Sequence, residues 1–200
     1  DLIHAPNGAY FKRELGIVPG LINKFWDARE EARKKNDELA RYAIKIHMNS
    51  MYGVLASPNC RFFNRKVGNA ITGFAQKFIK LIALKVKEYG YEVVGGDTDS
   101  VFIHLGCESH DIAQEMGKQI ENNLNNFIKK YIEDEYKLDS FLELEFEKTF
   151  IRFVMPHVRG SDRGAKKRYA GLVRNDDGSE DISFTGLEMV RRDWTDLAKE

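Results

Sequence analysis

Two aspartates separated by one residue, preceded by two glycines and placed between apolar runs, constrain the fold of this chain most. Residues 93–103 read VVGGDTDSVFI, and this pattern predicts a tight β-hairpin over residues 91–105 with Asp97 and Asp99 at its tip. Residues i and i+2 lie on the same side of an extended chain, so the two carboxylates can converge. Because like charges repel at short distance, a hard divalent cation such as Mg²⁺ would keep both ionised. A solvated turn is the alternative interpretation.

A second motif, KIHMNSMYG, places three different functional groups on one face of a predicted helix. Lys45, Asn49 and Tyr52 follow i, i+4, i+7, and side chains at that spacing form one stripe. A lysine cation suits phosphate, an amide both donates and accepts hydrogen bonds, and a tyrosine ring offers a stacking surface. The stripe indicates a site for a charged, planar ligand, and a solvated helix face is the other interpretation.

A third motif, KKRYAG, places three cations and an aromatic ring at the start of a predicted strand. These residues are Lys166, Lys167, Arg168 and Tyr169. Such a cluster is typical of contact with a nucleic-acid backbone, because phosphate charge dominates that interaction. A basic turn without a partner would have the same composition.

Composition limits the classes of function that remain. The chain of 200 residues has 31 basic and 31 acidic side chains, which excludes a uniformly cationic nucleic-acid binder and leaves only local patches for DNA. Cys60 and Cys107 lack the spacing of a zinc or redox site. The sequence contains neither a bilayer-spanning apolar run nor a leader, so a cytoplasmic location without membrane contact is the default expectation.

Hydrophobic periodicity predicts an α+β fold in which helices pack on one face of an antiparallel sheet. Helices are expected after Gly20 and over residues 38–52, 69–89, 109–131 and 187–199. Strands beyond the hairpin are expected around residues 141–148, 150–155 and 167–174, followed by a turn at 175–179. In the first of these strands Glu143, Glu145 and Glu147 alternate with apolar residues, so Glu145 or Glu147 could lie near the metal site or face solvent.

Taken in chain order, the three motifs resemble the fingers and palm of family B DNA polymerases. The resemblance extends through RFF at 61–63, LEFE at 144–147, MP at 155–156, RGSD at 159–162 and GLEMVRRDW at 186–194. It is strongest toward the bacterial polymerase II branch and covers nearly the whole chain. It implies a short helical hairpin of the fingers over residues 1–55 and a palm over residues 56–200. Such polymerases are far longer, so the chain is expected to be a fragment.

The resemblance implies a DNA-directed DNA polymerase that transfers dNTPs to a primer 3′-hydroxyl with two Mg²⁺ ions, for which Mn²⁺ could substitute. Asp97 and Asp99 would be the catalytic and metal-binding carboxylates, with Asp99 bridging the metals. The incoming nucleotide would be bound by Arg29, Arg33, Lys45, Asn49, Tyr52 and Thr98. Primer–template DNA would be bound by Gly53, Lys166, Lys167, Arg168 and Tyr169. A sliding clamp would bind through a C-terminal part outside this chain, and a bacterial enzyme would be associated with the nucleoid.

Two departures from the family pattern bear on catalysis. Family members usually carry tyrosine where Gly95 stands, and they take a second bridging aspartate from an upstream D-x-x-S-L-Y-P-type motif that this chain lacks. The isolated 200 residues are therefore expected to fold without catalysing synthesis. The alternative function is a catalytically inactive palm that acts as a DNA-binding or structural module. A D-x-D nucleotide-sugar transferase would leave Lys45, Asn49 and the basic cluster without a role.

Overall fold

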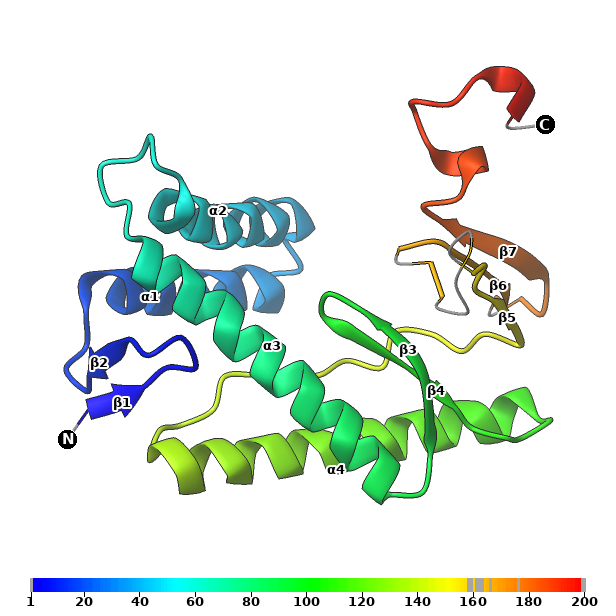
Figure 1. Ribbon diagram of the computed structural model, residues 1–200, viewed down its shortest axis with the longest axis horizontal. Coiled ribbons are helices and arrows are strands. Elements are labelled where there is room, and N and C mark those ends of the chain that lie inside the picture. Colours follow the sequence, from blue (N-terminus) through cyan, green and yellow to red (C-terminus); the bar gives the residue numbers. More distant parts are fainter. Residues whose placement is uncertain (1, 158–159, 161–163, 166, 176, 199–200) are drawn as a thin grey trace. The chain divides into compact units, whose positions relative to one another are not determined.

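The computed structural model describes residues 2–157, 160, 164–165, 167–175 and 177–198, and it divides into two compact units, Asp1–Phe78 and Ile79–Glu200. The described residues form four α-helices and seven short strands, which pair only in antiparallel fashion within three small sheets (Figure 1). The predicted combination of helices with antiparallel strands is therefore confirmed. Among the described helices, none combines the length and apolar character needed to cross a membrane.

The first unit is built around a pair of packed helices. A small hairpin of β1 (Leu2–His4) and β2 (Tyr10–Lys12), which the sequence did not predict, precedes α1 (Ile17–Lys34) and α2 (Glu38–Ala56). The break between the helices falls at Asn36, whose φ of 54° is left-handed, and the Asp37 side chain caps α2 by accepting a 2.9 Å hydrogen bond from the Ala40 amide. The predicted helix over 38–52 is confirmed and extends one turn further.

The second unit contains the predicted β-hairpin, a long helix and a three-stranded sheet. The helix α3 (Arg65–Glu88) begins in the first unit and ends in the second. The hairpin strands β3 (Glu92–Asp97) and β4 (Ser100–His104) follow, and then α4 (His110–Tyr136). The sheet has the order β5 (Arg152–Val154), β6 (Tyr169–Arg174), β7 (Glu180–Thr185), and it is followed by the 3₁₀ turns η1 (Glu188–Val190) and η2 (Asp196–Ala198).

The core of the second unit lies on one face of α4. Its buried positions repeat every three or four residues, as expected for the apolar face of a helix, and they are Ala113, Gly117, Ile120, Leu124, Ile128, Ile132 and Tyr136. The end of α3 adds buried Ile82 and Val86, and Lys85 of α3 lies 4.9 Å from the centre of the Phe127 ring of α4. In Figure 1 the two helices cross at this point.

The strand predicted around residues 141–148 does not form, and no other helix or strand takes its place. The Asn125 side chain of α4 accepts from the Leu144 amide at 2.8 Å and donates to the Leu144 carbonyl at 2.9 Å. The Phe146 ring packs so closely on Gly117 that a β-carbon there would lie 2.5 Å from it. A helix side chain therefore satisfies backbone groups that a neighbouring strand would otherwise bind.

The helix predicted over residues 187–199 is also wrong. The described part of this segment forms only η1 and η2, separated by extended backbone at Arg191. Its large apolar side chains are exposed, including Met189, Trp194 and Leu197. A helix depends mainly on packing of an apolar face for its stability, so the periodic sequence alone is insufficient here.

Ile128→Ala is expected to destabilise the protein by about 3 kcal/mol, because Ile128 is 0% exposed and its truncation leaves a cavity. Equilibrium unfolding in urea measures this change. Ile112→Ala on the same helix is the matched control, since 52% of that residue is exposed; its cost should stay below about 1 kcal/mol. Equal losses for the two variants would contradict the assignment of the core.

Candidate active site

The two aspartates stand at the tip of a two-residue turn, as the sequence predicts. Asp97 pairs with Ser100 across the hairpin, and Thr98 adopts a left-handed φ of 51°. The Asp97 carbonyl accepts from the Asp99 amide at 2.5 Å and from the Ser100 hydroxyl at 3.1 Å. The Thr98 hydroxyl donates to the Asp97 carboxylate at 3.0 Å. Hydrogen bonds within the motif itself therefore fix the backbone that carries both carboxylates.

The two carboxylates differ in exposure, because Asp97 lies in the strand and Asp99 in the turn. The Asp97 side chain is 26% exposed, whereas Asp99 is exposed. Within the described residues, no group of three or more His, Cys, Asp or Glu side chains could hold a metal ion. Glu145 and Glu147 therefore do not complete a cluster with Asp97 and Asp99, and both of those glutamates are exposed.

The basic motif reaches the hairpin tip through Lys167. Its ammonium nitrogen lies 3.9 Å from the Asp97 carboxylate, and 67% of the Lys167 side chain is exposed. An exposed ion pair of this kind contributes little stability. The contact matters because it places the Lys167 ammonium group beside the hairpin tip. Sequence motifs far apart in the chain meet here. Lys166, the first cation of the motif, lies outside the described residues.

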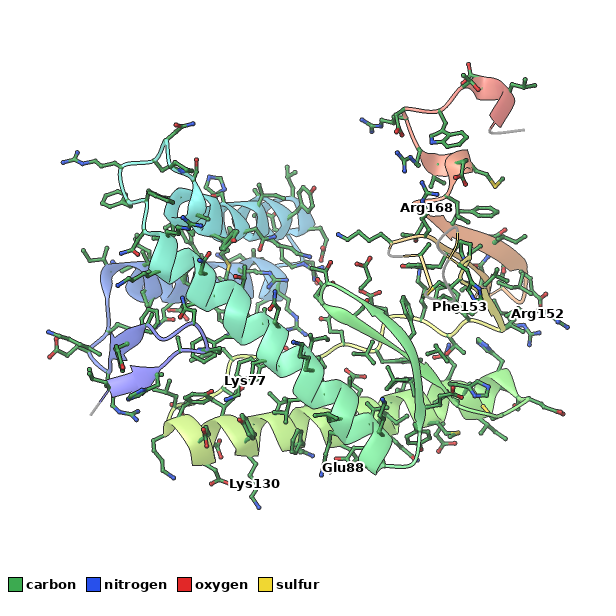
Figure 2. All side chains as sticks on the ribbon, viewed as in Figure 1. Lys77, Glu88, Lys130, Arg152, Phe153 and Arg168 are labelled. Carbon is green, nitrogen blue, oxygen red and sulfur yellow. The ribbon has the colours of Figure 1, made fainter. Side chains whose placement is uncertain are left out.

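An aromatic cluster joins the hairpin to the sheet behind it. The Phe102 ring of β4 lies 5.0 Å from both Phe153 of β5 and Tyr169 of β6, between ring centres, and Phe150 lies at 6.4 Å. Figure 2 labels Phe153 among these side chains. Aromatic pairs at such distances add to the stability given by burial. Tyr169, predicted to contact DNA, therefore also fixes the hairpin on the sheet.

Met155 fills the space beside the glycine at the position where the family usually has tyrosine. A β-carbon on Gly95 would lie 3.0 Å from the Met155 terminal methyl group. On the next residue, Gly96, a β-carbon would lie 2.8 Å from the Ser100 carbonyl oxygen. The first contact involves a flexible side chain and the second a backbone atom. Gly96 is therefore required by the hairpin itself, whereas the side chain permitted at Gly95 depends on Met155.

The predicted nucleotide-binding residues other than Thr98, which lies in the hairpin turn, are found on α1 and α2 in the first compact unit. The helical spacing of Lys45, Asn49 and Tyr52 is confirmed, and all three are exposed, as is Gly53. On α1 the Arg29 guanidinium lies 5.7 Å from the centre of the Trp26 ring, and Arg33 is 3.6 Å from Glu30. The α1–α2 residues thus form their own set, in a different unit from the two aspartates.

A charged network beyond β7 was not predicted from the sequence. Arg168 pairs with Glu188 at 3.2 Å, and Arg191 pairs with Asp193. The hydrogen bond from Arg191 holds the pKa of the Asp193 carboxyl below its usual value, and the charge of Arg168 acts in the same direction. Glu188, Arg191 and Asp193 belong to the GLEMVRRDW sequence and Arg168 to the KKRYAG motif, but the pairing between the two motifs could not be predicted from spacing alone.

Comparisons with known proteins link this chain to one protein family. The model of the family described as DNA polymerase family B matches residues 3–200. DNA polymerase II of Escherichia coli K12 is 38% identical over 100% of this chain and 26% of its own length. The DNA polymerase of Desulfurococcus sp. Tok is 29% identical over 92% of this chain and 23% of its own length. The chain thus spans about a quarter of the length of these relatives.

A solved structure shows the same fold. The family B DNA polymerase from the hyperthermophilic archaeon Pyrobaculum calidifontis matches with a TM-score of 0.60 over 94% of this chain and 22% of its own length, at 24% identity. The similarity at this level of identity concerns the fold.

Proposed function

This chain belongs to DNA polymerase family B, and on that premise we propose that it forms the fingers and palm of a DNA-directed DNA polymerase. The proposed reaction is transfer of a nucleotidyl group from a dNTP to a primer 3′-hydroxyl. The observation that carries the proposal is the GDTDS hairpin, which holds Asp97 and Asp99 at a tight turn with Lys167 of the basic motif beside it. The family match over residues 3–200 supports it independently.

Family B DNA polymerases generally use divalent metal ions, and we assign Mg²⁺ to Asp97 and Asp99. The donors fit this ion, because one half-buried and one exposed carboxylate offer hard oxygen ligands and leave room for water and substrate phosphates. When bound, two such ions neutralise the charge that develops on the attacking and leaving oxygens. Mn²⁺ has the same ligand preference, and the second bridging aspartate would come from the upstream motif.

We assign the remaining residues to substrate binding. The cations of α1 and α2, Arg29, Arg33 and Lys45, would bind the triphosphate together with Asn49, and Thr98 would shape the turn at the hairpin tip. Tyr52 and Gly53 would pack under the nascent base pair. Lys166, Lys167, Arg168 and Tyr169 would hold the primer strand near its 3′ end, where lysine and arginine contact phosphate without reading the bases.

In this proposal residues 1–55 act as the fingers and residues 56–200 as the palm. A sliding clamp, bound through a segment C-terminal to these residues, is a further proposed partner. In a bacterial source the protein would act on nucleoid DNA.

Gly95 favours a second candidate function, a palm that has lost its chemistry and serves as a DNA-binding or structural module. The tyrosine usual at this position is absent, and Met155 lies against the glycine instead. The polymerase and the DNA-binding form of the inactive palm both predict DNA binding, but only the polymerase predicts nucleotide transfer.

Primer extension with the full-length protein that contains these residues tests the proposal. We expect template-directed extension in Mg²⁺ or Mn²⁺, and its complete loss when EDTA removes the metal. A binding assay on the same primer–template runs in parallel. Tight DNA binding without extension under any metal would contradict the polymerase and support the inactive palm.

A further inference from the structure

The chain that follows β7 lies against the basic residues that precede β6. The last pair of the β6–β7 ladder is Tyr169 with Thr185. Lys167 and Arg168 therefore stand just beyond this pair on one strand, and Gly186 stands just beyond it on the other. Three contacts described below connect these residues to one another and to the hairpin tip.

The first contact joins Gly186 to the backbone of Lys167. Lys167 has a left-handed φ of 60°, a conformation that is unfavourable for a non-glycine residue. A β-carbon on Gly186 would overlap the Lys167 carbonyl oxygen, so the two backbones are in direct contact. Gly186 is itself left-handed, with a φ of 61°. A strained conformation persists only where its surroundings enforce it, and here the close approach allowed by glycine does so.

The second contact joins Glu188 to the side chain of Arg168. The guanidinium nitrogen and the carboxylate oxygen are 3.2 Å apart, and the side chains are 38% and 33% exposed. Figure 2 shows Arg168 beside the chain that leaves β7. Because Glu188 compensates its charge, Arg168 presents little net charge to a phosphate. Its role in this arrangement is to fix the start of β6.

The third contact joins Lys167 to the hairpin tip. The mainly exposed Lys167 side chain places its ammonium group 3.9 Å from the Asp97 carboxylate. Among the described cations of the motif, Lys167 is therefore the one whose charge is available both to the hairpin and to a nucleic-acid phosphate. Its direction depends on the left-handed backbone that Gly186 supports.

We propose that residues 186–188 are a positioning element: Gly186 sets the backbone of Lys167, and Glu188 sets Arg168, so that Lys167 addresses the primer strand beside Asp97. The inference rests on the proposed polymerase function and extends it to residues that touch neither nucleotide nor metal. Of the two described cations assigned to the primer strand above, it keeps direct phosphate contact for Lys167 and replaces that of Arg168 by a supporting role.

Gly186→Ala in the full-length protein tests the first half of the proposal. This substitution removes no charge. It should nevertheless weaken primer–template binding about fivefold and reduce the salt dependence of binding by about one phosphate contact. The same changes are expected for Lys167→Ala. The double variant should bind primer–template no more weakly than either single variant, because both changes remove the same contact. Loss of stability alone would leave the salt dependence unchanged, so that slope distinguishes positioning from folding.

Gly178→Ala is the matched control. Gly178 is also left-handed, with a φ of 84°, and lies in the turn between β6 and β7, but a β-carbon there meets no atom within 4 Å. It should lower the unfolding temperature without changing the salt dependence. If Gly186→Ala keeps the wild-type slope while the wild-type protein extends primers, the positioning role is wrong and the polymerase function stands. If the wild-type protein extends no primer, the polymerase function itself fails.

A charge exchange tests the second half and does not require Gly186→Ala to fold. Arg168→Glu should weaken primer–template binding, and Arg168→Glu with Glu188→Arg should restore at least about half of it, because the ion pair re-forms with reversed polarity. Restoration supports a positioning role for Arg168. A double variant as weak as Arg168→Glu alone would show that Arg168 itself contacts DNA and would overturn this half of the proposal.

Discussion

Asp99→Ala in the full-length protein is expected to lower the rate of nucleotide incorporation by at least about a thousandfold, which corresponds to about 4 kcal/mol of barrier. The Asp99 carboxylate is exposed at the hairpin tip and has no ion-pair partner among the described residues. Its loss would therefore remove the proposed oxygen ligand without leaving a buried charge unpaired. Primer–template affinity should remain within about twofold, because that affinity depends mainly on phosphate contacts.

Single-turnover incorporation and equilibrium binding of a labelled primer–template measure the two quantities separately. Asp139→Ala is the control, because Asp139 is also an exposed aspartate but lies in the loop after α4. Retention of more than about a tenth of the wild-type rate would be a loss below 1.4 kcal/mol and would exclude Asp99 from the chemistry. A parallel loss of rate and DNA affinity would instead indicate that the hairpin itself had been disrupted.

Local signals predicted most of the helices and the hairpin. The glycines, the two-residue turn and the apolar flanks specify β3 and β4 within a short stretch of chain, and the apolar face of α4 lies within one continuous helix. The alternation around Leu144 and Phe146 was equally clear but misleading. Which group pairs with an extended backbone is decided by the tertiary structure, and here the Asn125 side chain takes that place.

In the candidate site, too, some features follow from local sequence and others depend on the tertiary structure. The motifs predicted the hairpin that carries Asp97 and Asp99 and the helical spacing of the α2 residues, since both depend on residues close together in the chain, whereas the roles of these residues stay predictions. The sequence could not reveal that Lys167 reaches Asp97, because the contact depends on how β6 and the hairpin pack through the ring of Phe102. The close approach of Gly186 to Lys167 was likewise hidden, since a glycine in a sequence indicates conformational freedom but not the neighbour that requires it.

Lys45→Ala is expected to lower kcat/KM for the incoming dNTP by about a hundredfold, or about 2.7 kcal/mol. Lys45 lies on the exposed stripe of α2, and no ion pair among the described residues engages its ammonium group. A lysine held on a helix face can act as a point charge for phosphate, and a contact that strengthens as charge develops affects kcat as well as KM.

Steady-state and single-turnover kinetics across a range of dNTP concentrations, with primer–template in excess, separate the two contributions. Lys45→Arg keeps the charge and should recover part of the loss, since a guanidinium also binds phosphate but with a different geometry. Lys24→Ala, an exposed lysine on α1, is the matched control and should leave the nucleotide dependence unchanged. If Lys45→Ala and Lys24→Ala give the same kcat/KM, the α2 stripe is a solvated helix face and the triphosphate is bound elsewhere. A hundredfold difference between them would place the negative charge of the nucleotide beside α2, whereas equal weakening of primer–template binding would assign Lys45 to DNA instead.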